Sequence, residues 1–351
     1  MQASNLDLTL INPLSGTEWD DLLSTHSDTT IFHTSAWARV LARTYCHQPF
    51  YLHFTQSGRS VALLPLMEVA SRFTGSRGVC LPFSDFCAPL LFDCAEADAL
   101  RAHLVELAAE RNWNHIELRG ATVTAFAPDG MTGTFLAHTL DFPVAEEALF
   151  ASFDSSVQRA IRKAERCGVR VDILQTGEAM QKFYRLHSQT RKRHGVPPQP
   201  FAFFRHIQEE IIAPGRGFIA LAQSGARCIA AAVFFHGGGK GLFKFGASET
   251  RHQNVRPNNL VIWEGMRYLL RNGCRSLHFG RTAPGDEGLR RFKLSWNSME
   301  ENLLYVRFNP ITGIFVPVQP AKSFAPQQKV FAKLPLALNA LAGRLIYPHL
   351  D

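Results

Sequence analysis

A stripe of positively charged residues follows Ser155. Four cations recur at the helical spacing i, i+3, i+4 and i+7: Arg159, Arg162, Lys163 and Arg166. An α-helix would carry all four on one face and turn the apolar positions between them toward the core. Such a face can hold phosphate groups. A solvated helix surface is the alternative, and it is the commoner outcome for charged helices.

A second cationic cluster, Arg191-Lys192-Arg193-His194, ends the next expected helix. Cations at a helix C-terminus are favoured by the macrodipole alone. Four basic or titratable side chains exceed what capping requires. Binding of an anionic substrate through Arg191 and Arg193 therefore stands beside the capping interpretation.

A strand end, a loop and a helix start follow one another near residue 250. The strand end is Lys244-Phe245-Gly246-Ala247-Ser248, and Pro257-Asn258-Asn259 opens the helix. Proline suits the first helical position and Asn258 suits the cap. Because the unpaired amides of a helix start attract anions, we place Lys244, Ser248, Asn258 and Asn259 at a substrate site. An ordinary capped helix is the alternative.

The segment from Gly280 to Lys293 sets glycine, proline and acidic residues between basic ones. This composition predicts a loop at a strand end, where chemistry is often located. Lys293 is expected to stabilise a developing negative charge or to bind a phosphate. Asp286 is a candidate catalytic group and Arg291 a candidate substrate contact. A solvated lysine before a strand is the alternative for Lys293.

Other catalytic systems lack support in this sequence. There is no Gly-x-Ser-x-Gly elbow and no Walker-type phosphate loop. The 14 histidines show no paired metal spacing with acidic support, so we expect no metal site. Gly237-Gly238-Gly239 falls between two expected strands and predicts a hairpin turn. Seven cysteines without a Cys-x-x-Cys pair argue against a disulfide framework.

Two segments of the chain occur twice, in the same order. Gln56-Ser57-Gly58-Arg59 and the apolar run after it return at Gln223-Ser224-Gly225, and Glu110–Gly120 is echoed by Leu270–Gly280. A duplicated domain explains both matches. We expect an α/β (α+β) protein with one domain at residues 1–150, a second at 151–310, and a proline-rich tail with a terminal helix at 311–351.

Composition sets the broad class. Apolar content of 46% and charged content of 19% are ordinary for a globular protein. The net charge of +7 favours an anionic partner, whether nucleic acid, a phosphorylated substrate or a membrane surface. No secretory signal or membrane-spanning run is recognisable. We expect a cytoplasmic protein, with the inner face of the membrane as an alternative location.

Periodicity and turn residues predict the main elements. In the first half we expect a helix after Ser35, strands at 50–55 and 60–69, irregular chain at 75–89, a helix at 95–110 and a strand at 115–118. In the second half we expect a capping box at Ser155 and Gln158 and a helix that stops at Gly168. The expected strands there are 170–174, 217–222, 227–236, 241–247, 276–280 and 302–308. The expected helices are 179–194, 201–212, 259–272 and 336–346.

Four segments together resemble the FemAB family of peptidoglycan-bridge aminoacyltransferases and its acetyltransferase-like relatives. They are Phe32–Ala38, the helix Arg159–Gly168, Phe245–Ser248 with Pro257–Glu264, and Phe279-Gly280 with Gly288–Lys293. The resemblance extends to about Phe308 and includes the duplication. It implies two tandem GNAT-like domains, each a mixed central sheet flanked by helices. Phe292-Lys293 matches a Phe-Lys pair that lies at the transfer site in family members.

The resemblance also implies an activity. It predicts an N-acyltransferase that moves an aminoacyl or acyl group onto an amine of a cell-envelope precursor, in peptidoglycan or in exopolysaccharide systems. No resident cofactor is implied, because the acyl donor is a co-substrate, either aminoacyl-tRNA or acyl-CoA. Implied partners are an anionic nucleotide-linked or lipid-linked glycan precursor and tRNA. The expected helix 336–346, with apolar Leu338, Leu341 and Leu345 and basic Arg344, is a candidate for peripheral membrane contact. A tail helix packed on the body is the alternative, and its sparse charge favours that interpretation. Asp286, Glu264 and the leaving group are the candidate proton acceptors.

Two other functions fit the same residues. One is a CoA-dependent sugar N-acyltransferase. Acetyl-CoA-dependent GNAT proteins carry a Gln/Arg-x-x-Gly-x-Gly/Ala loop, however, whereas Arg251–Asn259 contains no glycine. The other is a non-catalytic protein that binds an anionic glycan precursor or RNA through its arginines, with steep salt dependence and no acyl product.

Overall fold

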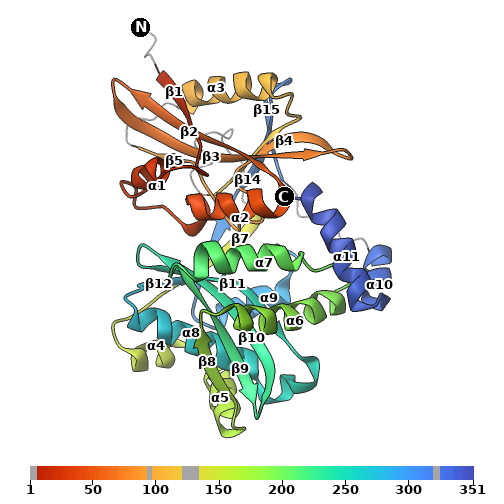
Figure 1. The fold of residues 1–351 in the computed structure, drawn as a ribbon. Coiled ribbons are helices and arrows are strands. Elements are labelled where there is room, and N and C mark those ends of the chain that lie inside the picture. The colour runs from red at the N-terminus through yellow and green to blue at the C-terminus, as the bar shows by residue number, and fades with distance from the viewer. Residues whose placement is uncertain (1–5, 93–96, 121–133, 319–324) are drawn as a thin grey trace. The chain divides into compact units, whose positions relative to one another are not determined.

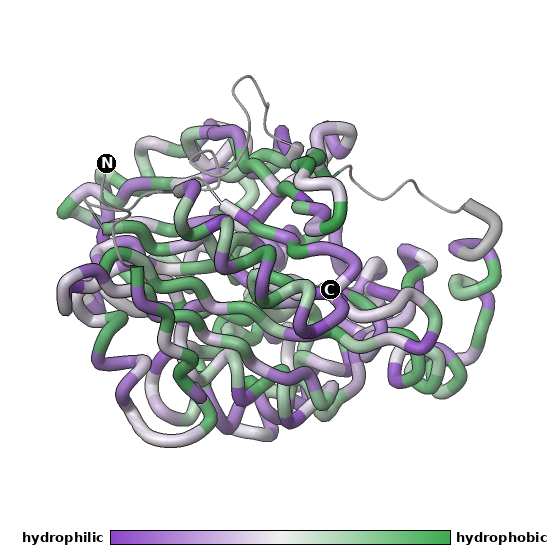
Figure 2. The backbone as a smooth tube through the Cα atoms, turned by 90° about the horizontal axis from the view of Figure 1, so that it is seen from above, coloured by the Kyte–Doolittle hydropathy of each residue, from purple (hydrophilic) through white to green (hydrophobic). Residues whose placement is uncertain are grey.

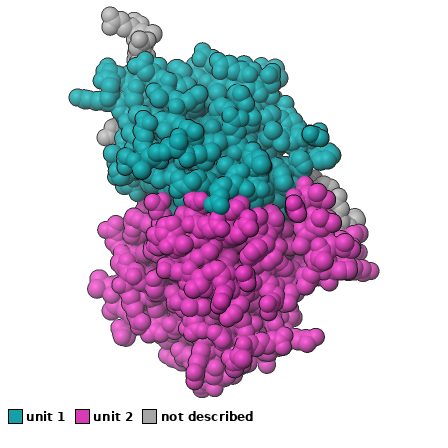
Figure 3. Space-filling model, viewed as in Figure 1, with its two compact units in different colours: residues 1–136, 302–320, 346–351 teal, residues 137–301, 321–345 magenta. Residues whose placement is uncertain are grey.

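The computed structural model describes residues 6–92, 97–120, 134–318 and 325–351. Two compact units divide the chain, and they are coloured separately in Figure 3. Unit 1 comprises residues 1–136, 302–320 and 346–351, and unit 2 comprises residues 137–301 and 321–345. The main segment of unit 2 ends at residue 301. Of residues 311–351, unit 2 contains 321–345 and unit 1 contains the rest.

Unit 1 is built on a mixed sheet with helices beside it (Figure 1). Its strands are β1 (Leu6–Ile11), β2 (Gln48–Gln56), β3 (Arg59–Ser71), β4 (Gly75–Val79), β5 (Leu90–Leu91), β6 (Ile116–Arg119), β14 (Tyr305–Asn309) and β15 (Ile314–Pro317). Its helices are α1 (Glu18–Leu23), α2 (Ser35–Tyr45), α3 (Ala97–Glu110) and the 3₁₀ turns Ile31–His33 and Tyr347–His349. The sheet order is β1-β2-β3-β4-β6-β14-β15, and β5 pairs with β3.

Unit 2 repeats this plan with longer helices. Its strands are β7 (Phe135–Asp141), β8 (Arg170–Leu174), β9 (Gly217–Ser224), β10 (Arg227–Gly237), β11 (Lys240–Ser248), β12 (Ser276–His278) and β13 (Met299–Leu303). Its α-helices are α4 (Glu146–Ser152), α5 (Ser155–Arg166), α6 (Gly177–Arg193), α7 (Phe201–Ile207), α8 (Pro257–Arg271), α9 (Glu287–Leu294), α10 (Ala325–Lys333) and α11 (Leu336–Ile346). The sheet order is β13-β7-β12-β11-β10-β9-β8.

The two sheets have the same topology. In unit 1, β1 to β4 are antiparallel neighbours and β4 is parallel to β6; in unit 2, β8 to β11 are antiparallel and β11 is parallel to β12. The repeated sequences fall on equivalent elements, at the ends of β2 and β9 and after α3 and α8. The expected duplication is therefore confirmed in the fold, as is the α/β class.

Each unit completes its sheet with a strand from beyond its own repeat. β7 follows the first repeat in sequence, yet it pairs antiparallel with β12 of the second. β14 follows the second repeat, yet it pairs antiparallel with β6 of the first. The exchange fills the same position in both sheets, next to the strand that follows the parallel crossover.

The core of unit 2 follows from the strand pattern. β9 and β10 are apolar on both faces because helices cover both, with α6 and α8 each packing on β9, β10 and β11. Long hydrophobic stretches are visible along the chain (Figure 2). The hairpin predicted at Gly237-Gly238-Gly239 is confirmed between β10 and β11, with positive φ at Gly238 and Gly239.

Several local predictions are wrong in detail. Residues 75–79 form β4 instead of irregular chain. The expected helix 201–212 is α7 followed by one π-helical turn at Gln208–Ile212. The expected strand 302–308 divides into β13 and β14. The capping box at Ser155 is absent because Asp154 is the N-cap and the Gln158 amide donates to the carbonyls of Phe153 and Ala151.

Candidate functional site

A gap opens between the two parallel strands of unit 2. β11 pairs with β12 only through Lys240, Gly241 and Leu242. Residues 243–248 continue along β10, but no described strand pairs with their other edge. The parallel pair therefore separates in mid-strand, and the two backbones diverge as a wedge whose β11 edge has no described strand partner. We call this the β11–β12 opening.

The equivalent gap of unit 1 is filled by its own chain. β4 pairs with β6 through Gly78 and Val79. The segment after β4 then folds back, so that the Cys80 amide donates to Glu117 O at 2.8 Å and the Cys87 amide to Arg119 O at 2.9 Å. A Cβ on Gly120 would lie 2.4 Å from the Ala88 Cβ. Among the described residues, unit 2 is therefore the unit in which the diverging strand keeps an edge without a backbone partner.

A β-bulge marks the start of the opening. Val233 faces Phe245 and Phe234 faces Phe243 across β10 and β11, so Lys244 is the extra residue of β11. Bulges re-aim side chains and are over-represented beside active sites. The Lys244 ammonium lies 5.4 Å from the centre of the Phe245 ring. The structure thus places Lys244, a predicted site residue, at the mouth of the opening.

A cationic pocket lies at the start of α8. This α8 pocket has a volume of about 450 Å³ and is lined by Ser156, Val157, Arg159, Ala160, Lys163, Arg256, Asn259, Phe292 and Ser295. Three of these side chains are cationic and none is acidic. Positive φ at Arg256 turns the chain into α8, whose first residue is Pro257. The side chain of the N-cap residue Arg256 makes no capping hydrogen bond, and the helix start together with the cations favours an anion.

The predicted cationic stripe of α5 divides between two surroundings. Arg159 and Lys163 line the α8 pocket, and Arg159 Nη1 also donates to Ser155 Oγ at 2.9 Å. Arg162 stacks on Phe150, with its guanidinium carbon 5.2 Å from the ring centre. Arg166 lies exposed in the last turn of the helix. Only half of the stripe therefore faces the pocket.

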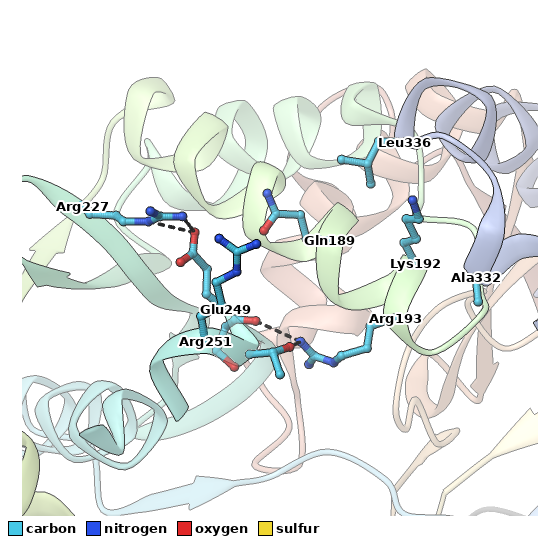
Figure 4. Close-up of a pocket in the computed structure, with 10 residues that line it drawn as sticks. Gln189, Lys192, Arg193, Arg227, Glu249, Arg251, Ala332 and Leu336 are labelled. Atoms are coloured by element: carbon cyan, nitrogen blue, oxygen red, sulfur yellow. Dashed lines mark hydrogen bonds and ion pairs between the residues drawn. The ribbon is translucent and has the colours of Figure 1, made fainter. Parts of the chain in front are cut away.

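A second pocket lies beside α6 and the end of β11 (Figure 4). This α6 pocket, of about 540 Å³, is lined by Gln189, Lys192, Arg193, Arg227, Ser248, Glu249, Thr250, Arg251, Ala332 and Leu336. Arg193 Nη1 donates to Ser248 O at 3.2 Å and to Thr250 Oγ1 at 2.8 Å. Arg227 pairs with Glu249 at 2.8 Å, which neutralises the one carboxylate of the lining. The pocket thus keeps a cationic surplus.

The chain between the two pockets is a 3₁₀ helix, Thr250–Val255. Its turn is held by its own backbone, with the His252 amide donating to Glu249 O and the Arg256 amide to Gln253 O. Asn258 is not the cap that the sequence predicts, because Arg256 occupies the cap. The side-chain amide of Asn258 instead donates from Nδ2 to Ser248 Oγ at 3.2 Å, and this hydrogen bond links α8 to β11. The absence of glycine from residues 251–259 therefore fits the helical backbone that this segment adopts.

Lys293 is buried, with only 3% of its surface exposed. Its ammonium donates to Gly280 O at 2.8 Å and to Arg281 O at 3.1 Å, just beyond β12. The solvated alternative for Lys293 is therefore wrong. Its neighbour Phe292 lies on the other side of α9 and lines the α8 pocket. The predicted Phe-Lys pair thus contacts the strand end with one side chain and the pocket with the other.

The remaining predicted residues lie apart from these groups. Asp286 is exposed and caps α9 by accepting from the Leu289 amide at 3.0 Å. Arg291 is exposed on α9. Arg191 is half-buried in the last turn of α6, where its charge contributes to the low pKa of His187. Glu264 pairs with Arg267 at 2.7 Å on α8.

Sequence reasoning missed a buried polar group beside Lys293. His138, on β7, is fully buried, and its Nε2 lies 3.1 Å from Glu300 Oε2. Glu300 in turn forms two hydrogen bonds with Arg290, at 2.7 and 2.9 Å. Burial, and then the charge of Lys293, lower the pKa of His138. No local pattern could reveal this group, because residues 138 and 300 meet only through the exchanged strand.

One described cluster carries ligand types that metals use. His115, Glu117 and Asp351 of unit 1 place their donor atoms within 4.8 Å of one another. Glu117 accepts from Arg119 at 2.6 Å and from Arg307 at 2.9 Å, and Asp351 accepts from Arg77 at 2.6 Å. Both carboxylates are thus occupied by guanidinium groups, and the cluster is an ion-pair network.

Comparison with known proteins agrees with this geometry. The model of the acetyltransferase (GNAT) domain family matches residues 151–294, which contain the opening and, apart from Ser295, the lining of the α8 pocket. The structure of FemX superposes with a TM-score of 0.65 at 14% identity, covering 84% of this chain and 95% of FemX. The chain is FemAB-like in fold. No curated protein sequence matches it.

Two further structures share the fold of this FemAB-like chain. A tandem GNAT protein from the clavulanic acid biosynthesis pathway has a TM-score of 0.55 at 12% identity, covering 91% of this chain and all of that protein. L-PGS from Bacillus licheniformis has a TM-score of 0.56 at 12% identity, covering 91% of this chain and 96% of its own. The helices within the described residues include none with the length and hydropathy to cross a bilayer.

Proposed function

We propose that this chain is an N-acyltransferase that moves an aminoacyl or acyl group onto an amine of a cell-envelope precursor. The GNAT domain supports acyl transfer, and the likeness to FemX and L-PGS supports the cell envelope. The observations that carry the proposal are the unpaired edge of β11 in unit 2 and the cationic pocket at the start of α8. The wedge suits the acyl arm of a donor, and the pocket suits its phosphates.

The proposed step is aminolysis of an activated acyl group. The amine nitrogen of the acceptor attacks the acyl carbonyl carbon, a C–N bond forms, and the C–O or C–S bond to the donor breaks. The proton lost by the amine passes to the departing oxygen or sulfur, since Glu264 is paired with Arg267 and Asp286 caps α9. A base need not then come from either carboxylate.

Lys293 has a positioning role in this scheme. Its ammonium holds the carbonyls of Gly280 and Arg281, and it adds a buried positive charge at the end of β12. A fixed positive charge near a developing oxyanion lowers the barrier, because the site need not reorganise during the reaction. His138 stays neutral beside it, since burial and Lys293 both lower its pKa.

The two donor classes make different demands on the loop 250–259. Its 3₁₀ helix uses backbone amides for internal hydrogen bonds, whereas a glycine-rich loop would offer them to a pyrophosphate. The α8 pocket offers side-chain cations instead of backbone amides, and side-chain cations are the groups that bind nucleic-acid phosphates. The lack of free amides in the loop therefore favours aminoacyl-tRNA over acyl-CoA as the donor.

The deciding experiment measures acyl transfer to an amine acceptor with each donor separately. We expect Arg159→Ala with Lys163→Ala to reduce kcat/KM by at least tenfold, while Arg166→Ala, on the same helix but outside the pocket, changes it less than twofold. Transfer that is insensitive to the pocket variants would remove the α8 pocket from the mechanism. Salt-sensitive binding of both donors without any product would favour the non-catalytic alternative.

A further inference from the structure

The helix α11 exposes its leucines and buries a polar residue. On α11, Leu338, Leu341 and Leu345 are 50%, 51% and 64% exposed, whereas Asn339 and Gly343 of the same helix are buried. Surface helices ordinarily turn leucine inward and polar residues outward. We call the three leucines the α11 leucine face.

Two contacts fix the rotation of α11 within unit 2. The Asn339 side-chain amide donates to Phe331 O of α10 at 2.6 Å. A Cβ on Gly343 would lie 1.9 Å from Pro198 O, so only glycine allows this close approach to the chain after α6. α10 itself packs against α6 (Figure 1). The helix cannot rotate its leucines inward without losing both contacts.

Exposed cations lie on the same two helices as the α11 leucine face. Lys329 and Lys333 are exposed on α10 and Arg344 on α11, and Val330 of α10 is 58% exposed. From Asn302 to Leu350 the sequence contains no aspartate or glutamate. Exposed leucines and exposed cations on two consecutive helices are complementary to a surface that is apolar below a layer of negative charge.

The α6 pocket reaches the tail helices on another side of α11. Ala332 and Leu336 line it together with Lys192, Arg193 and Arg251 (Figure 4). At about 100° per residue, Leu336 lies on the opposite side of α11 from the α11 leucine face, so the pocket is separate from that face. Exposed leucines alone would not distinguish a membrane from a protein partner, whereas exposed cations on a tail that has no acidic residue from Asn302 to Leu350 favour an anionic lipid surface.

We propose that the α11 leucine face docks unit 2 on a membrane surface of anionic phospholipids. The leucines enter the boundary between headgroups and acyl chains, and Lys329, Lys333 and Arg344 contact the lipid phosphates, as in helices that lie in the membrane plane. The inference goes beyond acyl transfer and does not depend on it.

The test is flotation of the purified full chain with vesicles, without any acyl donor. Vesicles of phosphatidylglycerol and phosphatidylcholine should carry the protein upward, and vesicles of phosphatidylcholine alone should carry it much less. Leu338→Gln, Leu341→Gln and Leu345→Gln together should lower the partition coefficient by at least about a hundredfold. Glutamine is chosen because it preserves helix propensity.

Two further variants complete the design. Leu10→Gln, Leu14→Gln and Ile311→Gln together remove exposed apolar side chains of unit 1 and should leave flotation unchanged. Replacing Lys329, Lys333 and Arg344 by glutamine should weaken binding to anionic vesicles by about fivefold per cation. Circular dichroism establishes that each variant is folded.

Three results would overturn the proposal. They are no flotation of the wild-type protein with anionic vesicles, flotation that is equal for the wild type and the leucine variant, and a dimer in light scattering that only the leucine variant dissociates. The last result would make a second copy of the chain the occupant of the face. Because no donor is present, failure here leaves acyl transfer to be judged by its own assay.

Discussion

The Lys293 ammonium and the Gly280 carbonyl oxygen lie 2.8 Å apart in the interior of unit 2. This hydrogen bond joins α9 to the end of β12, at the side of the wedge that the donor is proposed to occupy. A lysine with 3% exposure keeps its charge only where carbonyls replace its water, and Gly280 and Arg281 supply two of them.

Lys293→Met removes this charge while keeping most of the side-chain volume. We expect the loss to leave two carbonyls without their donor and to destabilise unit 2 by about 1–3 kcal/mol in urea unfolding. If Lys293 also supports the reaction, transfer should fall by at least about a hundredfold under conditions where the variant is folded. Arg291→Met, on the exposed side of α9, is the control. Full transfer by a folded Lys293→Met protein would contradict the positioning role.

His187 should make the protein sensitive to acid. Burial, and then the charge of Arg191, lower its pKa to about 3, and its Nε2 lies 3.1 Å from Gln199 Oε1. The unfolded chain takes up this proton near pH 6.5 and the folded chain does not, so stability falls as pH decreases below 6.5. Between pH 6.5 and 5 the loss from this residue should reach about 2 kcal/mol.

The measurement for His187 is urea unfolding at several pH values, compared with His187→Phe. Phenylalanine can stack on Phe183 as the imidazole does, so the variant should remain folded and should lose less stability in acid. The slope will not vanish, because burial also lowers the pKa of His47 in unit 1 to about 4. Equal slopes for both proteins would show that His187 takes up protons as readily when folded.

Glu117 should be among the most sensitive positions of unit 1. Its side chain is 2% exposed and accepts from Arg119, which is itself 3% exposed. Glu117→Ala leaves a buried guanidinium without its counter-charge, for which we expect a loss of about 3–5 kcal/mol. Asp98→Ala breaks the exposed pair with Arg101 and should change stability by less than about 1 kcal/mol. Similar losses for the two variants in urea unfolding would contradict this ranking.

Gly343→Ala should displace α11 from its packing against Pro198. The new methyl group would collide with Pro198 O, so the helix must shift and give up the buried position of Asn339. Hydrogen exchange of residues 336–345 should accelerate. Gly288→Ala on α9 is the matched change, because its Cβ would meet only Asp286 Oδ1 at 3.8 Å, and alanine should there stabilise the helix by about 0.5–1 kcal/mol. Unchanged hydrogen exchange in Gly343→Ala would mean that the chain at Pro198 can move aside and leave α11 in place.

Local sequence patterns determined much of this protein. Periodicity located the principal helices and strands, the hairpin glycines at 237–239 fixed β10 against β11, and two repeated segments revealed the duplication. The spacing of Arg159 and Lys163 also predicted a common face, and both residues line the α8 pocket. These features depend on neighbours within about ten residues, and the chain records them directly.

The tertiary structure decided what depends on distant partners. The exchange of β7 and β14 follows from pairing across more than 100 residues, which no periodicity encodes. The two repeats look alike in sequence, yet residues 80–91 pack beside the diverging strand of the first sheet, and no described segment does so in the second. The apolar spacing of α11 predicted a buried leucine stripe, and the close approach of Gly343 to Pro198 turned it outward. A hydrophobic pattern specifies a face, while contacts elsewhere decide which way that face points.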